Sequence, residues 1–374
     1  MDKVLSSNNK SLLIDVLSST NGSSTDVFDY KYTQNIPNGV KYRTYVSPNT
    51  VCNNIYGDEI FFNIPKVGLL SKMFIECILT STLDLTNTED NLANNVFEYI
   101  DLLTIDGHKT IQKLDQYYLK MRLDQSNSEL TSIFDTITNP NQTFNNNTVK
   151  CYIPLFYFFS DSPDKFINTR FTEELCIHAK VNETSTVMGL PDELTSVPTF
   201  RLICDFIIMN EFNENVPRNM LTYDFIRFKD VPITTGSTSV VVYVESCKNI
   251  FSTSMLLINN SQESTMINSF TIEVDSVILW DSDSRLSLLD CGWFDHANFK
   301  NEFSSLKAGN SMTTHYNSIF KNRNVNTLSV NTSHLPVQKY TINFDSIGAG
   351  FSLIMFSEYW NLLEITQNGK IQIS

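Results

Sequence analysis

The chain has 374 residues and a mass of 42.7 kDa, a length that favours two domains over one. It carries 27 basic and 41 acidic residues, a net charge of −14, which argues against a protein that coats nucleic acid because neutralising phosphates requires a basic face. Aromatic residues make up 12% of the chain, and the abundance of Phe, Tyr, Val, Ile and Thr favours β-strands.

Two segments in the first half have apolar residues at helical spacing. The first spans residues 111–123, and the second lies near residues 163–175. The chain contains no alternation of strand and helix patterns that would indicate a parallel sheet, and no Gly-rich phosphate-binding loop. We therefore expect short helices in loops rather than an α/β fold.

Short runs that alternate apolar and polar residues recur from about residue 28 onward, separated by clusters of Asn, Asp, Ser, Gly and Pro. The clearest run spans residues 200–208, where every second residue is apolar and Arg201 and Asp205 lie on the opposite face. Later runs are predicted at residues 240–244, 270–278, 341–345 and 351–356. Many strands and few helices predict an all-β protein built from sandwiches or barrels.

Polar connections are predicted at residues 86–95, 124–150 and 182–198. The favoured domain boundary lies at residues 230–239, where Pro232 and Gly236 interrupt the strand runs. This boundary leaves two parts, 26–230 and 231–374, each with enough strands for an eight-stranded sandwich. Within the second part, residues 281–334 are polar and irregular and are expected to form long surface loops.

The seven cysteines form no CxxC pair, and most lie in apolar runs, as Cys204 does in FRLICDFIIM. Such residues are typical of buried free thiols in a reducing compartment. The first residues lack the continuous apolar core of a signal peptide, and no run approaches 18 apolar residues. The sequence thus predicts a protein of a reducing compartment, without a signal peptide or a membrane-spanning segment.

A search for reaction chemistry finds no catalytic signature. The five histidines form no HxxxH or HxH pair, and the neighbours Asp106–His108 and Asp295–His296 lack metal-ligand spacing. Residues 281–284 resemble half of a calcium loop but lack its Gly and its terminal Glu. Adjacent carboxylates such as Glu173–Glu174 do not by themselves make an acid–base pair. We predict no catalytic, cofactor-binding or metal-binding residues, no cofactor and no enzyme activity.

Four segments, in order, carry a further pattern. FFNIPKVGLLSKMFIECILT (61–80) reads as a Pro-containing apolar strand, Leu-Leu-Ser and an outgoing strand, and residues 96–124 read as a strand, a Gly turn at 105–107 and a short aromatic helix. YIPLFYFFSDSPDKFINTRFTEELCIHAKVN (152–182) is the most specific segment. The fourth segment is the C-terminal half, with SFTIEVDSVILWDSDSRLSLLDC (269–291) and FSLIMFSEYWNLLEITQNGKIQIS (351–374).

By the order and spacing of these segments, the chain resembles the double jelly-roll major capsid proteins of nucleocytoplasmic large DNA viruses and their smaller relatives. In the third segment the positions that match the family pattern are Tyr152, Ile153, Pro154, Leu155, Phe158, Phe159, Pro163 and His178. The resemblance covers roughly residues 25–374. It implies two consecutive eight-stranded jelly-roll sandwiches, with 154–159 as a core strand.

The resemblance also implies a function and partners. The chain would be a structural subunit that forms pseudo-hexagonal homotrimers in an icosahedral shell. It would be located in the virion and assembled in the host cell interior. Its further partners would be neighbouring capsomers and minor capsid or penton proteins, without direct nucleic-acid binding. Residues 1–25 would be an N-terminal arm that could touch neighbouring capsomers or an internal membrane.

Three alternatives remain open at the sequence level. The first is a minor capsid or scaffold protein of the same fold. The second is a carbohydrate-binding β-sandwich of a viral spike, which should show clustered exposed aromatics, whereas Trp280, Trp293 and Trp360 are scattered. The third is an enzyme on a sandwich scaffold, which should show a cluster of histidines and carboxylates.

Overall fold

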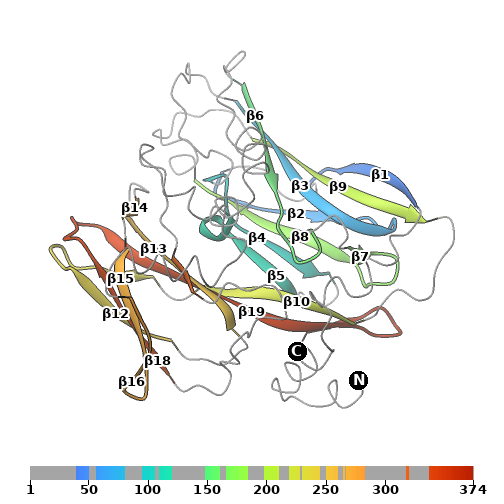
Figure 1. Ribbon diagram of the computed structural model, residues 1–374. Coiled ribbons are helices and arrows are strands. Elements are labelled where there is room, and N and C mark those ends of the chain that lie inside the picture. Colours follow the sequence, from blue (N-terminus) through green and yellow to red (C-terminus); the bar gives the residue numbers. More distant parts are fainter. Residues whose placement is uncertain are drawn as a thin grey trace. The chain divides into compact units, whose positions relative to one another are not determined.

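In the described part of the computed structural model, the regular structure is almost entirely antiparallel β-strand (Figure 1). Its contacts divide the chain into two compact units, one formed by residues 28–222 with 362–374 and the other by 1–27 with 223–361. No helix among the described residues is long and apolar enough to cross a membrane. The residues that the structure describes are 39–49, 56–80, 95–105, 109–119, 148–160, 166–183, 198–209, 219–227, 230–244, 250–259, 264–265, 267–282, 317–319 and 337–373.

The unit formed by residues 28–222 contains two antiparallel sheets. One has the order β1-β9-β3-β6, with the short strand β7 beside β3, and the other has the order β2-β8-β4-β5. The strands of the first sheet are β1 (Gly39–Val46), β9 (Thr199–Met209), β3 (Leu69–Thr80), β6 (Thr148–Pro154) and β7 (Ile167–Asn168). Those of the second are β2 (Glu59–Asn63), β8 (Leu175–Val181), β4 (Phe97–Thr104) and β5 (Thr110–Asp115).

This strand order is that of a jelly roll. When β7 is left out and the other strands are counted along the chain, the two sheets have the orders 1-8-3-6 and 2-7-4-5. Successive strands therefore tend to alternate between the sheets, and the first strand pairs with the last. Inward-facing side chains fill the space between the two sheets. For example, the ring centroids of Phe97 on β4 and Phe200 on β9 lie 5.1 Å apart.

The unit formed by residues 223–361 repeats the pattern. One sheet has the order β10-β19-β13-β14, with β11 and β20 beside β19 and β17 beside β13, and the other has the order β12-β18-β15-β16. The strands of the first are β10 (Asn219–Arg227), β19 (Phe351–Ile365), β13 (Ile250–Asn259), β14 (Ser264–Thr265), β11 (Val231–Pro232) and β17 (Asn317–Ile319). Those of the second are β12 (Ser239–Val244), β18 (Gln338–Phe344), β15 (Ile267–Val274) and β16 (Val277–Ser282). The short strand β20 (Ile371–Ile373) pairs with residues 363–365 at the end of β19, and both of these segments belong to the unit of residues 28–222.

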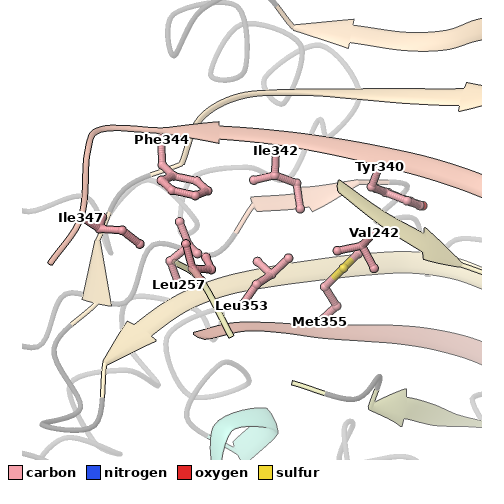
Figure 2. Packing of buried hydrophobic residues seen from close by; sticks show 9 residues of the cluster. Val242, Leu257, Tyr340, Ile342, Phe344, Ile347, Leu353 and Met355 are labelled. Carbon is pink, nitrogen blue, oxygen red and sulfur yellow. The ribbon is translucent and has the colours of Figure 1, made fainter. Parts of the chain in front are cut away.

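Alternation along the strands builds the core of this second unit. Tyr340, Ile342 and Phe344, at every second position of β18, are buried and face the neighbouring sheet (Figure 2). Leu257 of β13 and Leu353 of β19 lie opposite them. Two sheets with apolar residues between them are the arrangement of a β-sandwich.

Two predicted helices are wrong in the described residues. Residues 111–115 belong to β5, and only 116–119 form a helical turn. A β-bulge in the pairing of β4 with β5 turns both Ile111 and Gln112 inward, and with Leu114 this produces a spacing that imitates a helix.

The second wrong helix, near 163–175, contains β7, a turn and the start of β8 where it is described. Polar side chains bind the backbone here: the Thr169 hydroxyl donates to the Gly68 carbonyl at 2.9 Å, and the Asn168 amide oxygen accepts from the Arg170 N–H at 3.2 Å. The Asn168 bond is local and competes with helix formation, whereas the Thr169 bond ties this segment to residue 68, far away in the chain.

Two strand predictions also need correction. The predicted run 270–278 is a hairpin, because Asp275 and Ser276 adopt φ angles of 48° and 65° and connect β15 to β16. The predicted core strand 154–159 ends with β6 at Pro154, although Tyr157, Phe158 and Phe159 are buried. The runs at 200–208, 240–244, 341–345 and 351–356 are confirmed as β9, β12, β18 and β19 within small shifts of their ends.

Several predictions fall outside the described residues. These are the arm 1–25, the loop 86–95 apart from Asn95, and most of the loops 124–150, 182–198 and 281–334. Of the seven cysteines, Cys77, Cys151, Cys176 and Cys204 are described, and all four are buried free thiols, as predicted. Burial raises the pKa of Cys204, which makes it a poor nucleophile.

Candidate functional site

The outer face of the sheet β1-β9-β3-β6 carries a row of charged and aromatic side chains. Alternation explains their direction: on β3 the inward residues Met73, Ile75 and Cys77 are buried in the core, so Glu76 points outward. Cross-strand register then brings Arg201 of β9 opposite Glu76. Two strands of different sequence regions therefore place opposite charges side by side.

Glu76 is the centre of this row. Its side chain is 5% exposed, and Arg201 Nη2 lies 2.8 and 3.0 Å from its two carboxylate oxygens. Lys150 Nζ of β6 lies 3.0 Å from Glu76 Oε2. Burial raises the pKa of Glu76, but the hydrogen bonds from Arg201 and Lys150 outweigh burial and lower it below its ordinary value. The carboxylate is thus held ionised as a bridge across three strands.

A second pair lies at the β1 edge of the same face. The Arg43 guanidinium donates to both carboxylate oxygens of Asp205, at 2.6 and 2.8 Å, directly across the β1–β9 ladder. Arg201 lies over the ring of Tyr45 at 4.5 Å from its centroid. Two-pronged Arg–carboxylate contacts and Arg–aromatic stacking both fix side-chain orientation. The face is therefore polar, ordered and partly exposed.

The outer face of the sheet β2-β8-β4-β5 carries a different cluster, centred on His178. The His178 ring stacks on Phe61 at 4.4 Å and meets Tyr99 edge-on at 5.5 Å. Its Nε2 atom lies 3.2 Å from Glu59 Oε2, and Asp101 lies directly across the β8–β4 ladder. Sequence analysis identified His178 but missed this cluster, because it depends on the pairing of three strands that are distant in the chain.

Acidic groups in this cluster respond in opposite ways to their surroundings. Hydrogen bonds from His178 and Tyr99 lower the pKa of Glu59, whereas burial raises that of Asp101 in spite of Lys113 and His178. The described residues include no group of three or more potential ligands that could hold a metal ion. The arrangement can stabilise sheet pairing, and it lacks a nucleophile held by a base.

Sequence candidates for chemistry lie in structural roles where they are described. The Glu173 carboxylate accepts the N–H of Ile371 at 2.7 Å, and the Glu174 carbonyl accepts the N–H of Ile105 at 2.8 Å. The pairs Asp106–His108 and Asp295–His296 lie outside the described residues. None of the described candidates forms a reaction centre.

Comparison with solved structures shows similarity over nearly the whole chain. The PBCV-1 virus capsid superimposes with a TM-score of 0.71 at 12% identity, covering 90% of this chain and 97% of that chain. The mavirus major capsid protein superimposes with a TM-score of 0.56 at 10% identity, and the match covers 95% of both chains. The Sputnik virophage structure superimposes with a TM-score of 0.61 at 9% identity, and the match covers 95% of this chain and 91% of that chain.

No protein-family model and no curated protein matches the sequence. The similarity to solved structures therefore rests on the arrangement of strands, not on sequence identity. The chain has the double jelly-roll fold of viral major capsid proteins, as its sequence motifs predicted.

Proposed function

We propose that this chain is the major capsid protein of an icosahedral DNA virus, a structural subunit of the virion shell. One observation carries the proposal: both jelly rolls lie in a single chain, and the match covers 97% of the PBCV-1 capsid chain. A fold by itself does not fix a function, but an enzyme would need a reaction centre that the candidate residues do not form where they are described. The role is structural, like that of the matched capsid proteins.

The proposed assembly is a homotrimer, so that six jelly rolls form a pseudo-hexagonal capsomer. Capsid proteins of this fold imply assembly with other capsid subunits. The proposed further partners are neighbouring capsomers, minor capsid or penton proteins, and an internal membrane reached by the arm 1–25. Residues 26–230 and 231–374 would contribute one roll each to the capsomer. A net charge of −14 keeps free capsomers apart before assembly.

Size-exclusion chromatography with light scattering tests the trimer. Three chains of 42.7 kDa predict a species of about 128 kDa at micromolar concentration. Negative-stain images of this species should show six-lobed particles with three-fold symmetry. A stable monomer at micromolar concentration would contradict the proposed function.

A further inference from the structure

The outer face of the sheet β1-β9-β3-β6 is positively charged although the chain is acidic. We call this surface the cationic face. Among the described residues it carries five basic side chains and two carboxylates, Glu76 and Asp205, a net charge of +3. The whole chain has a net charge of −14. The basic side chains are Lys41, Arg43, Lys72, Lys150 and Arg201.

Both carboxylates of the cationic face are already paired. Glu76 binds Arg201 and Lys150, and Asp205 binds Arg43. No carboxylate in the described part of the chain pairs with the exposed residues Lys41 and Lys72. The basic members of the pairs also remain accessible, since the side chains of Arg43 and Lys150 are 54% and 46% exposed. The face therefore keeps unused positive charge at its surface.

We propose that the cationic face binds an acidic surface of a second copy of this chain. The inference rests on the proposed function, which brings many copies together. Ionic screening acts over about 8 Å at physiological salt, so a contact responds to the local charge and not to the net charge of the chain. The chain has 41 acidic and 27 basic residues, so a second copy offers an excess of carboxylates to the +3 charge of the cationic face.

The charge of the cationic face also determines the type of contact. A two-fold axis through the face would bring Lys41 and Lys72 of two copies together, and like charges repel. The contact is therefore heterologous, with two different surfaces meeting head to tail. Heterologous contacts close into rings when the rotation allows, and a three-fold ring is one such assembly.

Carbodiimide coupling tests the contact directly, because it joins a lysine to a carboxylate only where the two touch. An equal mixture of unlabelled and ¹⁵N-labelled chains is assembled and coupled, and its peptides are analysed by mass spectrometry. We expect mixed-isotope pairs that join Lys41, Lys72 or Lys150 to Asp or Glu. These pairs should decrease at high salt, since exposed charges are screened.

Paired variants test the role of charge. Lys41→Glu/Lys72→Glu reverses the two charges of the cationic face that pair with no carboxylate among the described residues. Lys66→Glu/Lys370→Glu makes the same change in net charge at two exposed residues off the face. We expect the first variant to weaken self-association about tenfold or more relative to the second. Circular dichroism and thermal melting check that both variants fold.

Several outcomes would overturn the inference. One is the absence of mixed-isotope pairs at the cationic face, and another is equal self-association of the two variants. A third is salt-sensitive binding of double-stranded DNA that Lys41→Glu/Lys72→Glu removes without affecting self-association. In each of these cases the proposed function is still supported if the wild-type chain forms three-fold particles. If the wild-type chain is a monomer, the proposed function itself is contradicted.

Discussion

Glu76 shows how a single buried charge is kept in a β-sheet. Removing a carboxylate from water is unfavourable unless hydrogen bonds and opposite charges replace the water. Arg201 and Lys150 supply both, one from each neighbouring strand. Their own side chains stay partly exposed, so the cluster avoids the full desolvation of three charges.

Glu76→Gln should destabilise the protein by about 1–3 kcal/mol at neutral pH, because two charge-assisted contacts are lost. The lowered pKa of Glu76 makes this contribution depend on pH. The stabilisation is present above about pH 4.5, the ordinary value, and is lost as the pH falls through the lower folded value. Urea unfolding at several pH values should therefore show a difference between wild type and variant that narrows in acid.

The matched control is Glu98→Gln, which removes the exposed pair of Glu98 with Lys180. This variant should lose less than about 1 kcal/mol of stability, because exposed ion pairs contribute little. A Glu76→Gln variant that behaves like this control at every pH would show that the Glu76 cluster does not stabilise the fold.

Gly369 is required by both its backbone angle and its surroundings. It has a φ of +80°, and an added Cβ would lie 2.8 Å from the Phe171 carbonyl oxygen. Gly369→Ala should therefore destabilise by about 2–4 kcal/mol, from backbone strain together with a backbone clash. Gly236 has a similar φ of +82° with nothing within 4 Å of an added Cβ. Gly236→Ala should lower the stability by about 1 kcal/mol, from backbone strain alone.

Chemical denaturation of both glycine variants separates the two effects. A larger loss for Gly369→Ala than for Gly236→Ala is the expected result. Equal losses would mean that the chain relieves the clash at Phe171 by moving.

At the scale of elements, strands that follow simple alternation were predictable, and those with irregularities were not. Residues 200–208 alternate without interruption, and β9 matches them. Residues 110–115 contain a bulge that turns two neighbouring side chains inward, which gives the apolar residues a helix-like spacing. The bulge can be recognised only from the pairing of β5 with β4. The hairpin at Asp275–Ser276 lacks the usual Asn-Gly signal, which explains why two strands were predicted as one.

This hairpin offers a test at the same scale. Both turn residues occupy the left-handed region, which is unfavourable for Ser276. Ser276→Gly should stabilise the protein by about 0.5–1 kcal/mol, because Gly adopts this φ without strain although it raises the entropy of the unfolded chain. Thermal melting measures the effect. Unchanged or lower stability would show that Ser276 is not strained in this turn.

At the scale of the whole molecule, two units share one strand order. The sequence predicted two sandwiches because strand runs fill both halves, and the fold confirms the double jelly roll. The two outer-face clusters could not be predicted, since Glu59, Tyr99 and His178 are brought together only by the register of β2, β8 and β4. Registers between distant strands depend on the whole sheet and not on local patterns.

The return of residues 362–374 to the unit of residues 28–222 was not visible in the sequence either. The Gly369 carbonyl accepts the N–H of Glu173 at 2.6 Å, and the Glu173 carboxylate accepts the N–H of Ile371 at 2.7 Å. Lys109 Nζ donates to the Ile371 carbonyl at 3.4 Å. These contacts join residues between 196 and 262 positions apart, which no local pattern indicates.

Glu173→Ala should release this C-terminal segment. Without the carboxylate, the Ile371 N–H loses its partner, and its hydrogen exchange should quicken about tenfold, equivalent to about 1.4 kcal/mol. Glu174→Ala, which removes an exposed neighbouring carboxylate, is the control and should leave the exchange of Ile371 unchanged. Equal exchange of Ile371 in the two variants would contradict the anchoring role of Glu173.

The C-terminal segment has a consequence for biosynthesis. A ribosome makes residues 28–222 first, then the whole of 223–361, and only afterwards the strand β20 that Glu173 and Lys109 hold. The unit of residues 28–222 is therefore translated first but stays incomplete until more than a hundred further residues have been translated. This unit can therefore gain its last strand only after residues 223–361 have been translated, so it is completed late in synthesis although its first strands are made early.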